Sequence, residues 1–350
     1  MTELALPALR VRADGERPAA GLAVAALAVV VGAALLAGFV PLGFSIATVF
    51  LFAGPHNWLE FRYFLSRMPP RWGGLRWFFL TGLVGTLTLA GAFVALAVAA
   101  RRFAWSEELL TNAGAVWNSA LVLWVCALVA LRNRERGRVA AGGADVAAAN
   151  AWLAPFAVGF LLVGGVWLWP TAWEVGLVYL HPLIALWFLD RELARQRPAW
   201  QRAYRQCLLA VPVALAVLWW RLADAPPLAG NDLLTMRITQ HAGADVMTGV
   251  SSHALVATHT FLEMLHYGVW LVAIPLVALR GGTWRLTAVP LARRSDGWRR
   301  AVLLAGVVGG LIVIGLWGAF LANYPLTRDV YFTIAIGHVL AEVTFLLRLL

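Results

Sequence analysis

Long apolar runs, each ended by arginines, prolines or polar clusters, dominate the pattern of hydrophobic and polar positions along the chain. A transmembrane α-helix needs about 20 mainly apolar residues, and ten runs close to that length follow one another. The pattern therefore predicts an all-α, polytopic membrane helix bundle. The predicted spans are residues 20–39, 43–63, 76–100, 115–132, 151–169, 171–189, 206–222, 251–279, 301–322 and 330–348.

The first two spans come from one apolar stretch, residues 19–55, which is too long for a single span. Pro41 and Gly43 interrupt it, and such residues end one helix and start the next. We therefore predict a helical hairpin whose first span is retained and is not a cleaved signal peptide. The predicted parts are a cytoplasmic tail (1–19), a helical bundle (20–348) and a longest outer loop (222–250), together one transmembrane domain (1–350).

The arginines fall mainly between alternate spans. Cytoplasmic loops of membrane proteins hold an excess of basic residues. An arrangement with both termini in the cytoplasm places 23 of the 28 arginines inside and 5 outside. The formal charge of +10 is therefore an orientation signal, and nucleic acid is not an expected partner.

The composition supports the membrane assignment and excludes several kinds of chemistry. The chain is 61% hydrophobic, with a mean hydropathy of +0.75, outside the range of soluble domains. It contains no lysine, which excludes a Walker A loop, a Schiff base and a lysine general base. Cys126 and Cys207 are the only cysteines, too few for a four-thiolate iron–sulfur cluster. Arginine in place of every lysine is typical of GC-rich bacterial genomes, so we expect a multi-pass protein of a bacterial inner (cytoplasmic) membrane.

Ionisable residues inside the apolar spans are the distinctive feature of the sequence. Such groups are costly in hydrocarbon and persist mainly where they pair, bind a ligand or line a polar cavity. Six of the seven histidines and four glutamates fall in predicted spans. Three spans repeat the spacing His-x-x-x-Glu, which places both side chains on one helix face. The pairs are His56 with Glu60, His259 with Glu263, and His338 with Glu342.

The three pairs are expected at a similar depth, because the spans that carry them all run from outside to inside. His266 extends the second pair to an i, i+4, i+7 set, and His181 lies near the middle of its own span. His253 is expected to point elsewhere, and His241 to be a solvated residue of the outer loop. The predicted metal ligands are His56, Glu60, His181, His259, Glu263, His266, His338 and Glu342.

Imidazole and carboxylate donors at one buried site suit iron, manganese or zinc, with iron the first candidate for a non-haem metal ion. Glu263 and His266 have the Glu-x-x-His spacing used on helices of di-iron bundles. In a second geometry the histidines bind the ion and each glutamate accepts the other ring N–H. Haem b is a further alternative, although only one helix carries two histidines 13 residues apart. Pairing of each histidine with its own glutamate, without a metal, also stays open.

A metal site among apolar, tryptophan-rich spans predicts a metal-dependent membrane oxidoreductase. Its expected partners are the lipid bilayer, a hydrophobic small-molecule substrate (a lipid, isoprenoid or quinone) and a redox partner. One alternative is a proton-coupled or divalent-metal transporter that uses the same residues. Another is a haem- or metal-holding subunit or assembly factor of a membrane complex.

Overall fold

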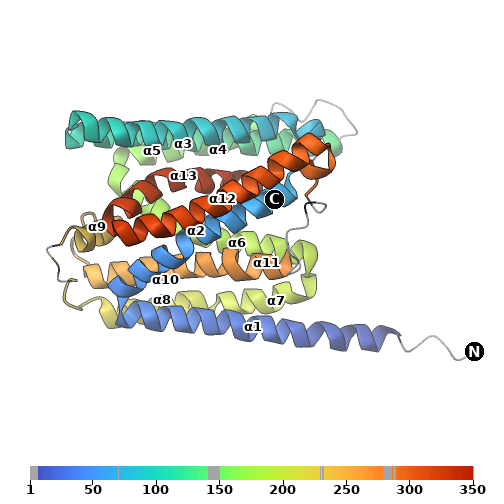
Figure 1. Ribbon diagram of the computed structural model, residues 1–350, viewed down its shortest axis with the longest axis horizontal. Coiled ribbons are helices and arrows are strands. Elements are labelled where there is room, and N and C mark those ends of the chain that lie inside the picture. The colour runs from blue at the N-terminus through green and yellow to red at the C-terminus, as the bar shows by residue number, and fades with distance from the viewer. Residues whose placement is uncertain are drawn as a thin grey trace, which may run out of the picture. The chain divides into compact units, whose positions relative to one another are not determined.

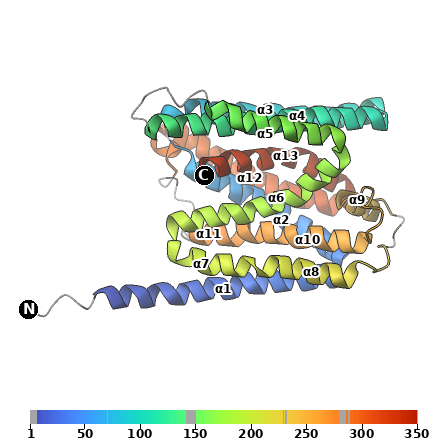
Figure 2. The same ribbon diagram turned by 180° about the vertical axis from the view of Figure 1, so that it is seen from behind.

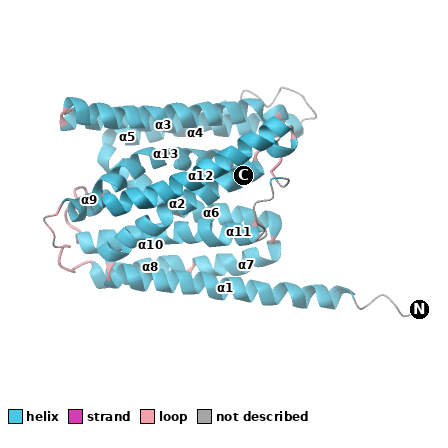
Figure 3. Ribbon diagram, viewed as in Figure 1, coloured by secondary structure: helices cyan, strands magenta, loops and turns pink. Residues whose placement is uncertain are grey.

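The computed structural model describes residues 7–69, 71–140, 150–228, 230, 232–278, 286 and 289–349. The protein is 89% helical, and no strand occurs among these residues (Figure 1, Figure 3). The predicted all-α class is therefore confirmed.

Eight helical segments in the described residues are long and apolar enough to cross a membrane. The chain is therefore a multi-pass membrane protein, as predicted. Three segments are whole helices: α6 (Pro170–Gln196), α12 (Asp296–Ala322) and α13 (Tyr324–Leu349). Two are parts of longer helices: Ala19–Phe39 in α1 (Pro7–Phe39) and Glu107–Gly137 in α4 (Glu107–Ala140). Three combine consecutive helices: Gly73–Phe103 consists of η1 (Gly73–Leu75) and α3 (Arg76–Phe103); Pro198–Leu222 of α7 (Pro198–Leu208) and α8 (Ala210–Leu222); and Ser252–Val277 of α10 (Ser252–Gly268), η3 (Val269–Ala273) and α11 (Ile274–Val277).

The other two predicted spans are helices that are not both long enough and apolar enough to be counted among these eight segments. In α2 (Pro41–Arg67), His56 and Asn57 interrupt the apolar stretch and lower its hydropathy. In α5 (Asn150–Leu168) the apolar part is short, covering Trp152–Leu168. The count of ten spans and the cytoplasmic location of both termini stay predictions.

The chain divides into two compact units, which are described separately. Unit 1 is Met1–Leu59 with Leu177–Thr283, and unit 2 is Glu60–Gly176 with Trp284–Leu350. The helices α2 and α6 each begin in one unit and end in the other. The predicted extent of a single transmembrane domain stays a prediction.

In unit 1, α10 is the central helix, and 13 of its 17 residues are buried. It lies between α8 and the unit-1 part of α6 in both views (Figure 1, Figure 2). Ala37 of α1, Leu218 of α8 and Phe261 of α10 belong to one apolar core. The ionisable residues of α10 are therefore surrounded by packed protein.

In unit 2, α3, α4 and α13 share a core that includes Phe78, Leu128 and Leu340. The indole N–H of Trp124 on α4 donates to the carbonyl of Thr81 on α3 at 2.9 Å. A buried indole N–H that is hydrogen-bonded in this way avoids the cost of an unsatisfied donor.

The segment predicted as the longest outer loop, residues 222–250, contains a short helix, α9 (Leu233–His241). Asp232 caps it by accepting hydrogen bonds from the backbone N–H and the hydroxyl of Thr235, at 2.9 Å and 2.6 Å. These hydrogen bonds hold the pKa of Asp232 below its usual value. The helix ends at His241, which brings that residue to the beginning of α10.

Candidate metal centre

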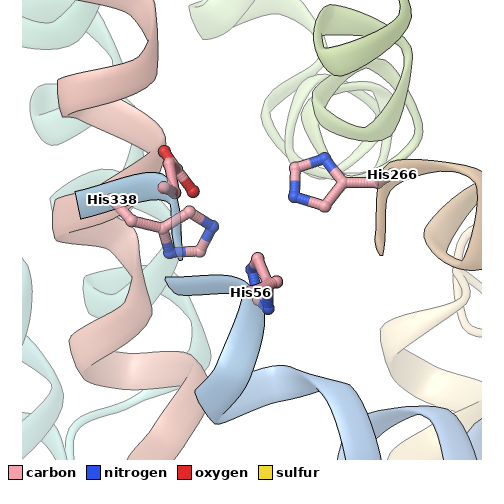
Figure 4. Close-up of side chains that lie close together, drawn as sticks. His56, His266 and His338 are labelled. Carbon is pink, nitrogen blue, oxygen red and sulfur yellow. The ribbon is translucent and has the colours of Figure 1, made fainter. Parts of the chain in front are cut away.

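Three histidines from three helices of unit 1 lie against one another. The ring centroid of His266 on α10 is 5.3 Å from that of His56 on α2 and 4.6 Å from that of His181 on α6. A ring nitrogen of His266 lies within 4.8 Å of a ring nitrogen of each of the other two. His56 and His266 are buried and project toward one another (Figure 4). We call His56, His181 and His266 the histidine cluster.

Each helix that supplies a histidine has, close to it, a feature that interrupts the regular α-helical hydrogen bonding. Pro55 precedes His56 in α2, and Pro182 follows His181 in α6. Proline has no N–H to donate to the carbonyl four residues earlier. The π-helical turn η3 begins three residues after His266, and such turns occur frequently at functional sites. The irregularities therefore coincide with the histidine cluster on all three helices.

The tautomer of His56 suits metal binding. Its Nδ1 lies 2.9 Å from the carbonyl oxygen of Phe52, and a carbonyl oxygen can only accept a hydrogen bond. Nδ1 therefore carries the proton, and the lone pair of the neutral ring is on Nε2. A histidine that binds a metal commonly donates its other ring N–H to a backbone carbonyl in this way.

Tyr267 connects the histidine cluster to Glu263 one turn back on α10. Its hydroxyl donates to Oε1 of Glu263 at 2.8 Å, and its ring centroid is 4.6 Å from that of His56. Trp270, in the next turn, is fully buried against Phe188. These contacts limit the rotamers of Glu263 and of His56.

A second group of ionisable residues lies in unit 2. Glu60 of α2 is fully buried, and neither of its carboxylate oxygens has a hydrogen-bond partner among the described residues. One of these oxygens is within 4.8 Å of a ring nitrogen of His338 on α13. Glu342, one turn further along α13, is also fully buried, and its charge acts on Glu60. A buried carboxylate without hydrogen bonds is costly unless a cation offsets its charge.

The helix α2 provides a chain connection between the two groups. His56 and Glu60 are four residues apart on it, so their side chains lie on one face in consecutive turns. Along α2, the His-x-x-x-Glu spacing therefore places Glu60 one helical turn after His56.

The remaining predicted ligands, His259 and Glu263, lie further toward the beginning of α10. The ring of His259 is 5.0 Å from the ring of His241 and 5.9 Å from that of Tyr179, centroid to centroid. His241, expected to be solvated, is thus half-buried against another histidine. The sequence interpretation missed Tyr267, although its i+4 spacing from Glu263 was a usable signal. Metal binding by any of the eight predicted ligands stays a prediction.

Known proteins provide no independent indication of function. No protein family model, no curated protein and no solved structure matches this chain. The functional inference therefore depends on the histidine cluster.

Proposed function

We propose that this integral membrane protein binds a non-haem metal ion through the histidine cluster, and that it is an oxidoreductase acting on a membrane-soluble substrate. The observation that carries the proposal is the spacing of three imidazole rings contributed by three helices, with His56 and His266 buried and His181 half-buried. Iron is the first candidate metal, and manganese and zinc are alternatives, because they suit imidazole and carboxylate ligands.

The ring spacing of each of the two pairs, His56 with His266 and His181 with His266, matches that of two imidazoles sharing one ion. A metal about 2.1 Å from an imidazole nitrogen lies about 3.2 Å from the ring centroid. Two rings around a tetrahedral ion then have centroids about 5.2 Å apart, and rings at a right angle about 4.5 Å apart. The observed separations of 5.3 Å and 4.6 Å lie close to these two values.

The same arithmetic disfavours a haem held between members of the histidine cluster. Two axial ligands on opposite faces of a haem iron would have ring centroids about 6.2 Å apart, if the iron–nitrogen distance is about 2.0 Å. Both observed separations are shorter than this. A single ion on one side of each ring fits better than a flat macrocycle between the rings.

A carboxylate within unit 1 offsets part of the charge of a divalent ion at the histidine cluster. Neutral imidazoles contribute no charge, so each carboxylate cancels one unit of the charge of the metal. Glu263 lies one turn before His266 on α10, and the hydroxyl of Tyr267 donates to its Oε1 at 2.8 Å. Its negative charge lowers the cost of placing a divalent ion inside the membrane.

The depth of the histidine cluster favours a substrate from the bilayer. His266 is 14 residues from the beginning of the segment Ser252–Val277 and 11 from its end, and His181 lies similarly within α6. At 1.5 Å per residue these positions are about 16–23 Å from the ends of the helices. A lipid, isoprenoid or quinone partitions to that depth. A metal ion held there would supply redox chemistry, and the expected redox partner would exchange electrons with it.

Metal analysis of the full chain in detergent tests the proposal. We expect about one equivalent of bound iron, manganese or zinc and no Soret absorption band. His266→Ala should lose the metal, whereas His253→Ala should retain it, because His253 is a half-buried residue of the same helix outside the histidine cluster. The proposal would be refuted if the wild-type protein, purified from cells grown with iron, manganese and zinc, contained no stoichiometric amount of any of these metals.

A transport assay distinguishes the main alternative. The transporter hypothesis predicts uptake of protons or divalent metal into proteoliposomes, loss of that uptake in Glu263→Gln, and no stoichiometric bound metal. That combination would assign the chain to the transporters. Bound metal without uptake would support the oxidoreductase.

A further inference from the structure

Within unit 1, two further histidines lie against each other where α9 contacts α10. His241, the last residue of α9, and His259 of α10 have ring centroids 5.0 Å apart and ring planes at 89°. His259 is 7% exposed, and His241 is half-buried. The centroid separation is close to the roughly 5.2 Å expected for two imidazoles around one tetrahedral ion. We call His241 and His259 the α9 histidine pair.

The surrounding contacts hold the α9 histidine pair in place. The hydroxyl of Tyr179 on α6 donates a hydrogen bond shared between the carbonyls of Ala242 and Leu255, at 2.9 Å and 3.2 Å. Through the Tyr179 hydroxyl, the residue after His241 is therefore linked to α10. The ring of Tyr179 lies 5.9 Å from that of His259, and apolar side chains of α9 and α10 share a small core. Three helices therefore fix the separation of the two imidazoles.

One face of α10 leads from the α9 histidine pair to the histidine cluster. His259, Glu263 and His266 are spaced i, i+4 and i+7, so their side chains follow one another along that face. The distance from His259 to His266 along the helix axis is about 10 Å at 1.5 Å per residue. Glu263, held by the hydroxyl of Tyr267, places a carboxylate oxygen between the two groups of imidazoles.

We propose that the α9 histidine pair is a second, weaker metal site that receives a divalent first-row transition metal ion from water and passes it, by way of Glu263, to the histidine cluster. The inference rests on the proposed function, because the histidine cluster is the destination of the ion. Imidazole selects this class of ion over magnesium and calcium. Two imidazole ligands hold an ion less tightly than the three imidazoles of the histidine cluster, as a site of transfer requires.

Titration of the metal-free full chain with Co²⁺ in detergent tests the second site, because the visible absorption of Co²⁺ reports its ligands. Wild-type protein should bind two equivalents of Co²⁺, one tight and one weak. His241→Ala should lose the weak equivalent and fill the tight site more slowly, by on the order of tenfold, at unchanged affinity. His253→Ala, near the beginning of the same helix, should behave as wild type. His241→Asn, which keeps a polar side chain, should repeat the result if the alanine variant folds poorly.

The Co²⁺ titrations distinguish failure of the second metal site from failure of the metal site at the histidine cluster. His266→Ala should lose the tight equivalent and keep the weak one. Absence of any Co²⁺ binding to wild-type protein would contradict both proposals. A single tight equivalent in the wild type, filled at the same rate in His241→Ala, would overturn the second site and leave the metal site at the histidine cluster standing.

Discussion

Replacing Glu60 by glutamine separates the cost of a buried charge from its benefit as a metal ligand. Glutamine keeps the shape of the side chain and removes the charge. Because Glu60 is fully buried, has no hydrogen bond to either oxygen among the described residues and lies near the charge of Glu342, we expect the variant to stabilise the metal-free protein. Glu60 is also one of the predicted metal ligands, and the same change removes its negative charge, so the variant should bind metal more weakly.

The two effects have comparable magnitudes and opposite signs. Replacing a buried charged group by a neutral one is often neutral or stabilising by about 1–4 kcal/mol, and we expect roughly 1–3 kcal/mol for Glu60→Gln without metal. An ion at 100 times its Kd stabilises the wild type by about 2.7 kcal/mol. A tenfold to hundredfold loss of affinity reduces that stabilisation by about 1.3–2.3 kcal/mol. The advantage of the variant should therefore shrink by this amount when metal is added.

Thermal unfolding followed by tryptophan fluorescence, with a chelator and with saturating Mn²⁺, measures both quantities on one sample. Glu174→Gln in α6 is the matched control, because Glu174 belongs to neither group of candidate ligands. Its shift in Tm should be the same with and without metal. The charge argument for Glu60 would be refuted if Glu60→Gln also shifted the Tm by the same amount in both conditions.

Three further substitutions test other parts of the structure. His181→Ala should lower metal affinity by at least about tenfold, measured by equilibrium dialysis; unchanged affinity would remove His181 from the site. Gly85→Ala places a Cβ 1.9 Å from the indole nitrogen of Trp124, so it should destabilise the fold by roughly 1–3 kcal/mol in thermal unfolding, whereas Gly91→Ala on the same helix, with open space around it, should not. Asp232→Asn should destabilise α9 near neutral pH. The lowered pKa of Asp232 means that its carboxylate stabilises α9 above the pKa of the unfolded chain. That contribution disappears as the pH falls through the folded pKa, so hydrogen exchange in α9 should differ between variant and wild type at pH 7 and converge in acid.

Much of the fold follows from hydropathy alone, because a run of apolar residues long enough to cross a bilayer has to satisfy its backbone polar groups internally and so forms a helix. All ten predicted spans correspond to helices. The helix α9 was missed because it is short and lies in a polar segment, where a span-length pattern is absent. Asp232 with Thr235 three residues later was the available capping signal.

The sequence identifies which residues are candidate ligands better than it identifies which of them lie close together in space. The His-x-x-x-Glu spacing identifies a face on each helix, but it does not say which helices are neighbours. His181 joins the histidine cluster through contact with His266, although no glutamate follows it at i+4. His259 shares a helix face with His266, yet its ring contacts come from α9 and α6. Contacts between residues distant in sequence decide both placements, and no local pattern contains them.

Pro55, directly before His56, gives the sharpest test of whether the irregular helix turns serve the metal site. Proline deprives the Leu51 carbonyl of a helical hydrogen bond, and Pro55→Ala restores the donor. We expect a gain in metal-free stability of roughly 1–3 kcal/mol and a loss of Co²⁺ affinity of about tenfold, because a more regular helix would aim His56 differently. Pro155→Ala in α5, a helix that supplies no candidate ligand, is the matched control and should raise stability with affinity unchanged. Isothermal titration calorimetry and thermal unfolding on both variants decide the matter. A Pro55→Ala protein that binds Co²⁺ as tightly as the wild type would show that the proline shapes α2 without positioning the ligand.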